Sequence, residues 1–84
     1  MAFRVGRCLL LLHLKNSDLS QQELADRVGM TRQQINNYAH DRAIMTLENA
    51  INISAVLGCS VESMYELEVV SVEELKRERS SRRE

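Results

Sequence analysis

Residues 19–42 decide the fold, and they read LSQQELADRVGMTRQQINNYAHDR. Ser20 stands three residues before Glu23, which is the spacing of a capping box at the start of a helix. Thr31 and Gln34 repeat this spacing at a second helix start. Gly29 lies between the two predicted helices, where a residue in the left-handed conformation commonly ends a helix. The stretch therefore predicts two short helices joined by a tight turn, which is a helix-turn-helix.

The apolar residues of this stretch predict one shared core. They are Leu24, Ala25, Val28, Met30 and Ile35. On the second helix, Ile35 and Tyr38 face inward, so the polar residues around them point outward. These outward residues are Arg32, Gln33, Asn36 and Asn37. Because Arg can bond guanine with two hydrogen bonds, and Gln or Asn can do the same with adenine, this helix is a candidate for entering a DNA major groove.

Composition predicts a small, all-α fold. The chain has 84 residues, no proline and only three glycines, and it is rich in helix-forming residues. We predict helices at residues 3–15, 20–28, 31–40, 47–57 and 60–67, with Thr46 and Ser60 as the last two N-caps. Residues 1–68 then form one domain. Residues 69–84 form an extension with a sixth helix that starts near Val72 and frays by Ser80 into a disordered tail.

The first predicted helix is apolar over more than one face. Its core stripe is Val5, Leu9 and Leu12. Leu10, Leu11 and Leu14 lie off this stripe. This surplus must be covered by the C-terminal segment or by a second subunit.

The charges and the cysteines exclude several kinds of function. The formal net charge is −1, but Arg27, Arg32 and Arg42 concentrate positive charge near the predicted DNA helix. Cys8 and Cys59 are too far apart for a zinc site, and we expect free buried thiols in the cytoplasm. No carboxylate pair, activated nucleophile or phosphate-binding glycine loop is evident, so we expect no enzyme, metal or cofactor. The apolar run 8–14 is too short to span a membrane.

The chain resembles the phage repressor and Cro family, also called the XRE type, over residues 3–67. The resemblance is carried by QQELADRVGMTRQQINNY at residues 21–38 and TLENAINISAVLGCSVESMYEL at residues 46–67. It implies a five-helix, lambda-repressor-like domain that binds double-stranded DNA. It also implies a transcriptional regulator, expected to be a repressor that binds a two-fold operator as a homodimer.

The resemblance assigns roles to individual positions. The positions that match base-reading residues are Arg32, Gln33, Asn36 and Asn37. The positions that match contacts to the DNA backbone are Gln21, Thr31, Gln34, His40 and Arg42. In the predicted fifth helix, the candidates for the dimer interface are Val61, Met64 and Tyr65. Val70 and Val72 are further candidates, because they can pair as a short strand with a sister chain.

The chain departs from the family's pattern at several positions. Ala39 stands where most relatives have Glu, and His13 stands where the Arg partner of that Glu is usual. Both halves of a buried ion pair are therefore missing together, which can be nearly neutral for stability. Asp41 replaces a frequent Gly and Met45 a frequent Pro, so the loop around them is expected to follow its own path.

An alternative function remains open. The chain can be an antitoxin or another protein-interaction module, with the partner held by the first helix or by the C-terminal segment. The terminal Arg79, Arg82 and Arg83 either touch DNA or form a solvated tail.

Overall fold

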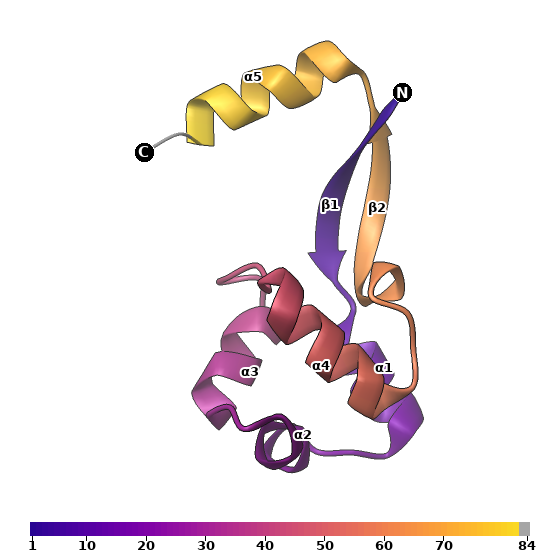
Figure 1. Ribbon diagram of the computed structural model, residues 1–84, viewed down its shortest axis with the longest axis vertical. Coiled ribbons are helices and arrows are strands. Elements are labelled where there is room, and N and C mark those ends of the chain that lie inside the picture. The colour runs from indigo at the N-terminus through magenta and orange to yellow at the C-terminus, as the bar shows by residue number, and fades with distance from the viewer. Residues whose placement is uncertain (83–84) are drawn as a thin grey trace.

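A helical body carries a projecting two-stranded sheet in the computed structural model, which describes the backbone of residues 1–82 and the side chains of residues 1–78 (Figure 1). The body consists of α1 (Leu10–Ser17), α2 (Gln21–Val28), α3 (Arg32–Ala39) and α4 (Leu47–Leu57). The sheet consists of β1 (Ala2–Cys8) and β2 (Tyr65–Val70), and the 3-10 helix η1 (Glu62–Met64) leads into β2. The last helix, α5 (Val72–Arg82), lies at the far end of the sheet.

The prediction of an all-α fold is wrong at both ends of the predicted domain. Residues 3–8 were expected to begin the first helix, and residues 65–67 to end the fifth, but they lie in β1 and β2, which pair antiparallel. Gly6 disfavours a helix by about 1 kcal/mol and suits the irregularity in the pairing between Val5 and Cys8. A Cβ atom at Gly6 would lie 3.1 Å from the carbonyl oxygen of Glu66, so the two strands approach closely there.

The core lies between the four helices of the body and is completed by η1. Its fully buried large side chains are Leu10, Leu24, Ile35, Ile53 and Met64. Leu10 and Leu14, which were predicted to be surplus, belong to this core, whereas Leu12 of the predicted stripe is 52% exposed. The predicted stripe begins at Val5, which lies in β1 and not in α1. Its helical period therefore does not continue into α1, and it marks the wrong leucines as buried.

The predicted caps of α2 and α3 are confirmed. The Ser20 hydroxyl accepts the Glu23 N–H at 3.0 Å, and the Glu23 carboxylate accepts the Ser20 N–H at 2.9 Å. Thr31 and Gln34 form the same reciprocal pair. Gly29, with φ +70°, ends α2 in the left-handed conformation. Together these contacts fix the angle at which α3 leaves α2.

The helix after β2 begins where a sixth helix was predicted. The Ser71 hydroxyl accepts the Glu74 N–H at 3.1 Å, so Ser71 caps α5. The helix continues to Arg82, beyond Ser80, where fraying was expected. The predictions for the side chains of Arg79, Arg82 and Arg83 lie outside the described residues.

The positions where the family's ion pair is missing have their own contacts. The His13 ring Nε2 donates to the Ser63 carbonyl oxygen at 2.8 Å, and this bond joins α1 to η1. Ala39 is buried in the core. The two replacements are therefore compatible, because neither leaves a charge without a partner in the core.

The loop after α3 follows a path set by Asp41. This residue has φ +59°, in the left-handed region that Asp tolerates better than most residues. Its carboxylate accepts the Cys8 N–H at 2.9 Å, so the loop is tied to the end of β1. Further along, the Met45 N–H donates to the Tyr65 hydroxyl at 3.1 Å. The loop is thus held against both strands.

We expect the cap of α2 to make stability depend on pH. Hydrogen bonds from the Ser20 backbone and side chain lower the pKa of Glu23 below its ordinary value of 4.5. Because the folded pKa is lowered, the stabilisation is present above pH 4.5 and is lost as the pH falls through the lowered value. Thermal melting of wild type and Glu23→Gln should therefore differ at neutral pH and converge in acid. A difference that is constant across this range would contradict the prediction.

Candidate nucleic-acid interface

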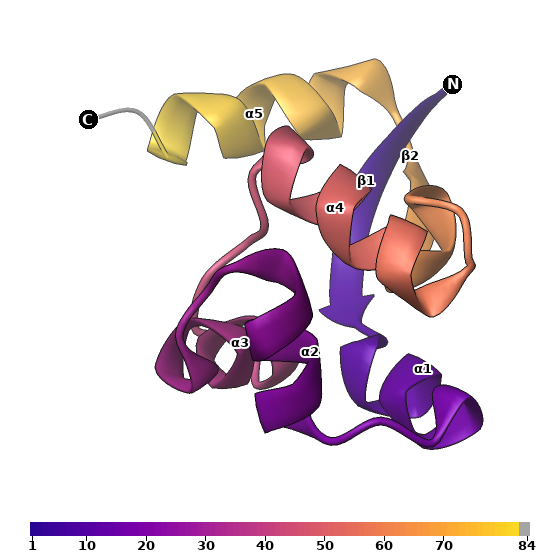
Figure 2. The ribbon, with the colours of Figure 1, turned by 60° about the horizontal axis from the view of Figure 1, so that its bottom comes forward.

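The turn between α2 and α3 brings the two helices into close packing (Figure 2). Ala25 is fully buried, and a larger side chain there would separate the helices. The Met30 N–H donates to the Ala25 carbonyl oxygen at 3.0 Å across the corner. On α3, Ile35 and Tyr38 face the core, and the Tyr38 hydroxyl accepts a hydrogen bond from Asn49 of α4 at 2.9 Å. These contacts fix the rotation of α3 about its axis, and so the face it presents outward.

The outward face of α3 carries all the predicted base-reading residues. Arg32 and Gln33 are exposed, and Asn36 and Asn37 are half-buried. Arg32, Gln33 and Asn36 line a shallow hollow on this surface. The face therefore combines one cation with several amide groups, which is the donor and acceptor set that can bond base edges.

Hydrogen bonds connect this face to the start of α2 and to the loop after α3. Arg42 donates to Asn36 Oδ1 at 2.8 Å, and Asn36 Nδ2 donates to Gln21 Oε1 at 3.2 Å. Gln33 Nε2 donates to Asn37 Oδ1 at 3.0 Å, and Arg42 makes a longer contact of 3.5 Å to the same oxygen. The amides of two helices are thus joined in one network around Arg42.

The network sets which group each amide presents. Arg has only donors, so Asn36 must turn its oxygen toward Arg42 and its NH₂ toward Gln21. The Gln21 oxygen is then occupied, and its NH₂ is the group available to a phosphate oxygen. Asn37 has its oxygen occupied by Gln33, so its NH₂ is available to an acceptor such as guanine O6 or thymine O4.

The predicted backbone-contact residues surround this face. Gln21 is the first residue of α2, where helix N–H groups and the helix dipole favour an anion. Thr31 and Gln34 are exposed, but their side chains already bond one another's backbone in the cap of α3. His40 is the C-cap of α3 and is exposed. Arg42 is exposed in the loop after α3. Its guanidinium bonds Asn36, so Arg42 lies at the edge of the base-reading face.

The five predicted interface residues do not share one surface. Met64 is fully buried in the protomer's own core, and Val70 is buried near α5. Val61 and Tyr65 are half-buried, and Val72 is exposed. Sequence reasoning missed the exposed apolar residues of the sheet, which are Phe3, Val5, Leu67 and Val69. The signal that could have identified the first strand is its alternating pattern, in which the apolar Phe3 and Val5 are each followed by a residue that is not apolar.

Within residues 1–82, no group of three or more His, Cys, Asp or Glu residues is placed to hold a metal ion. Both cysteines are free thiols; burial raises the pKa of Cys8, and Cys59 is half-buried rather than buried as predicted. No described helix is long and apolar enough to cross a membrane.

Comparison with known proteins identifies relatives of the chain. Residues 13–64 match the sequence model of a helix-turn-helix family. The chain is 32% identical over 66 residues to the SPbeta prophage-derived uncharacterized HTH-type transcriptional regulator YopS of Bacillus subtilis (strain 168), covering 77% of this chain and 89% of that protein. The crystal structure of hypothetical transcription factor NHTF from Neisseria superposes with a TM-score of 0.62 and 26% identity, covering 81% of this chain and 75% of that one.

A second solved structure shares the fold alone. A transcriptional regulator from Listeria innocua superposes with a TM-score of 0.58 at 16% identity. The superposition covers 89% of this chain and 76% of that one.

Proposed function

The chain belongs to the helix-turn-helix DNA-binding transcriptional regulators of the XRE family, which are not enzymes, and on this premise we propose that it represses transcription by binding a two-fold operator as a homodimer. The observation that carries the proposal is the exposed face of α3, with Arg32 and three amide side chains beside the start of α2. Such a face has the chemistry to bond base edges and phosphates at the same time.

The proposed complex places α3 in the major groove. Arg32 bonds a guanine, while Gln33 and Asn37 bond neighbouring bases; Asn36 adds to this face mainly through its bonds to Gln21 and Arg42. Gln21 holds a phosphate at the N-terminus of α2. Further backbone contacts come from Thr31, Gln34, His40 and Arg42. Repression then follows from occlusion of polymerase, in the cytoplasm, where the sequence predicts the protein to work.

The charge of the chain supports specific rather than general DNA binding. A net charge of −1 gives weak attraction to DNA of arbitrary sequence. The cations Arg27, Arg32 and Arg42 lie on or beside the α2–α3 unit, so attraction is concentrated where the bases are read. We therefore expect the ratio of specific to non-specific affinity to be large for so small a protein.

Selection of bound sequences from a random duplex pool tests the proposal. We expect enrichment of a palindrome whose half-sites lie about 34 Å apart, one turn of DNA, as the recognition helices of a two-fold dimer require. Repeating the selection at low and moderate salt separates phosphate attraction from base recognition. If no sequence is enriched above the non-specific background at moderate salt, the operator proposal fails.

A protein-binding function is the second candidate, and the exposed apolar surface of the sheet favours it. If the chain is an antitoxin, this surface and α5 bind another protein, and DNA binding is coupled to that partner. The leucine surplus that was expected to support this version is smaller than predicted, because Leu10 and Leu14 are buried in the core. Co-purification of an equimolar partner together with a failed DNA selection would favour it.

A further inference from the structure

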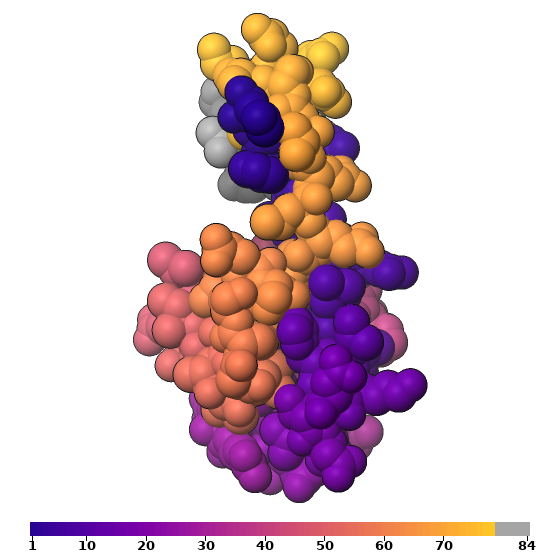
Figure 3. Space-filling model, turned by 90° about the vertical axis from the view of Figure 1, so that its right-hand side faces the viewer, coloured from indigo at the N-terminus to yellow at the C-terminus, as the bar shows by residue number. Residues whose placement is uncertain are grey.

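One face of the two-stranded sheet is apolar and uncovered in the described part of the chain. Phe3 lies opposite Val69, and Val5 lies opposite Leu67, so these four side chains project from the same face. Each of them is between 45% and 63% exposed. We call these four residues the ribbon face. Figure 3 shows the sheet crossing a narrow waist between the helical body and α5, with its side chains open to solvent.

The opposite face of the sheet is already occupied. It carries Ala2, Arg4, Glu68 and Val70, and α5 packs against β1. Arg4 pairs with Glu68 at 2.8 Å and also with Glu78 of α5. Val70 is buried. Helix α5 therefore covers the face that carries Arg4 and Glu68, and it leaves the ribbon face uncovered.

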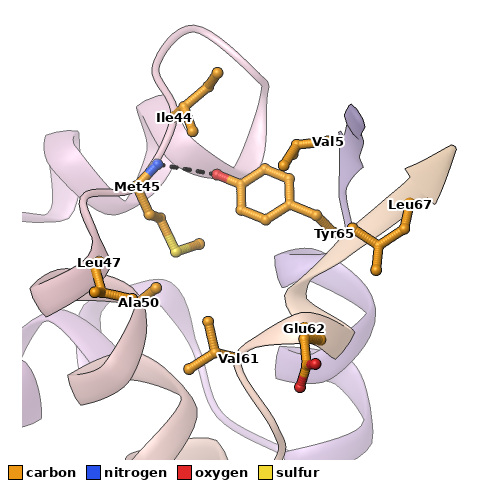
Figure 4. A pocket seen from close by; sticks show the side chains of 9 residues that line it. All are labelled: Val5, Ile44, Met45, Leu47, Ala50, Val61, Glu62, Tyr65 and Leu67. Atoms are coloured by element: carbon orange, nitrogen blue, oxygen red, sulfur yellow. Dashed lines mark hydrogen bonds between the residues drawn. The ribbon is translucent and has the colours of Figure 1, made fainter. Parts of the chain in front are cut away.

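An apolar groove continues the ribbon face toward the body. It has a volume of about 330 Å³, and Val5 and Leu67 form its wall on the side of the sheet. Figure 4 shows Ile44, Met45 and Leu47 on the other side. Ile44 and Leu47 are 59% and 71% exposed. Ribbon face and groove together form one apolar surface, with Glu62 as the one charged side chain that lines the groove.

We propose that a second copy of this chain covers this surface, with the two ribbon faces stacked on each other about a two-fold axis. The axis lies between the two sheets, parallel to their planes and perpendicular to the strands, so Phe3 and Val69 at the tip of each ribbon lie over the groove of the other copy. Each copy then gives and receives the same contact, as an isologous interface requires. The inference rests on the proposed homodimer and identifies the surface through which it forms.

The size and charge of the surface indicate this occupant. The four residues of the ribbon face with Ile44 and Leu47 are six large apolar residues, each between 45% and 71% exposed, and burying them supplies a substantial part of the roughly 800 Å² that each partner buries in a standard interface. The four charged side chains of β1 and β2 are paired, Arg4 with Glu68 and Arg7 with Glu66 at 3.2 Å. Two copies therefore meet without bringing unpaired strand charges of like sign together.

The stability of the sheet gives an independent reason for a covering partner. A lone pair of strands is marginal in water, and α5 packs against only one face of this pair, so a partner on the apolar face adds to the stability of the sheet. Stacking two ribbons produces a four-stranded, two-layer arrangement with the apolar side chains between the layers. The surface shares no residue with the outward face of α3, so the contact does not use the side chains that the proposed function assigns to DNA.

Sedimentation equilibrium of the full chain without DNA tests the surface. We expect wild type to have twice the 9.6 kDa mass of one chain, and Phe3→Asp and Val69→Asp to have the single mass. Leu12→Asp is the matched control, because Leu12 is equally exposed but lies on α1, and it should remain a dimer. If the aspartate variants do not fold, Phe3→Thr and Val69→Thr replace them in the test, because threonine favours strands. Each should raise the dissociation constant of the dimer about tenfold or more.

The outcomes separate this inference from the proposed function. A monomeric wild type, or folded Phe3 and Val69 variants that remain dimers, would overturn the surface, even if DNA selection still yields an operator. A wild-type dimer that the Phe3 and Val69 variants dissociate supports the surface, even if no DNA sequence is enriched. A second protein that binds the same face in place of a copy would leave wild type monomeric on its own, and so would also overturn it.

Discussion

Replacing Gln33 with alanine should reduce the affinity for the selected operator by about 1–3 kcal/mol and relax the preference at one base pair per half-site. Gln33 lies on the exposed face of α3, and its amide bonds Asn37 in the free protein. The substitution therefore removes one base contact and one support of its neighbour. Titration against operators changed at each position in turn should show the largest loss of preference at the pair that Gln33 contacts and a smaller one at the pair that Asn37 contacts.

Two glutamine variants provide the controls for this result. Gln21→Ala should weaken all sequences to a similar extent, because Gln21 is placed to bond a phosphate and phosphates are the same at every base pair. Gln22→Ala should change little, because Gln22 bonds Asp26 on α2 and lies outside the network around Arg42. If Gln33→Ala and Gln21→Ala lose affinity equally on every sequence, the assignment of these two positions is incorrect.

Replacing Ile53 with alanine should lower the free energy of unfolding by about 2–5 kcal/mol. Ile53 is fully buried on α4, so the substitution removes buried methyl groups and leaves a cavity that a small core cannot refill. A loss of this size is a large share of the roughly 5–15 kcal/mol expected for the whole fold.

The matched control for this loss lies two residues earlier on the same helix. Ile51 is 49% exposed, and Ile51→Ala should cost less than about 1 kcal/mol. Urea unfolding followed by circular dichroism measures both variants. Equal losses at the two positions would show that the core does not lie on the Ile53 face of α4.

The helix-turn-helix could be predicted because its signals are local. The two capping pairs and the left-handed Gly29 each act over three or four residues, and all three occur as expected. The sheet could not be predicted in the same way. Phe3 and Val69 form their pair across almost the whole chain, and the apolar residues near the N-terminus also fit a helical period.

The candidate site could be predicted only in part, for a related reason. Which residues of α3 face outward follows from the helical period and the inward positions of Ile35 and Tyr38. The network around Arg42 depends on the path of the loop after α3. That path is set by the left-handed conformation of Asp41 and by its hydrogen bond to Cys8 at the end of β1. No local sequence pattern predicts a bond between residues 33 positions apart. The interface candidate Met64 follows from the role of the fifth helix in the family and Val70 from a strand shared with a sister chain, but both are buried within the protomer, and Val70 pairs with Ala2 of its own chain.

The pairing of β1 with β2 has a consequence for how the chain folds. Arg4 and Glu68, which face each other across the sheet, are 64 residues apart, so closing the sheet costs more chain entropy than forming any helix of the body. The helices should therefore form first, and β1 must wait with open edges until β2 has been synthesised. During that interval it can capture β2 of a neighbouring chain, so strand exchange between nascent copies is the characteristic misfolding risk of this architecture.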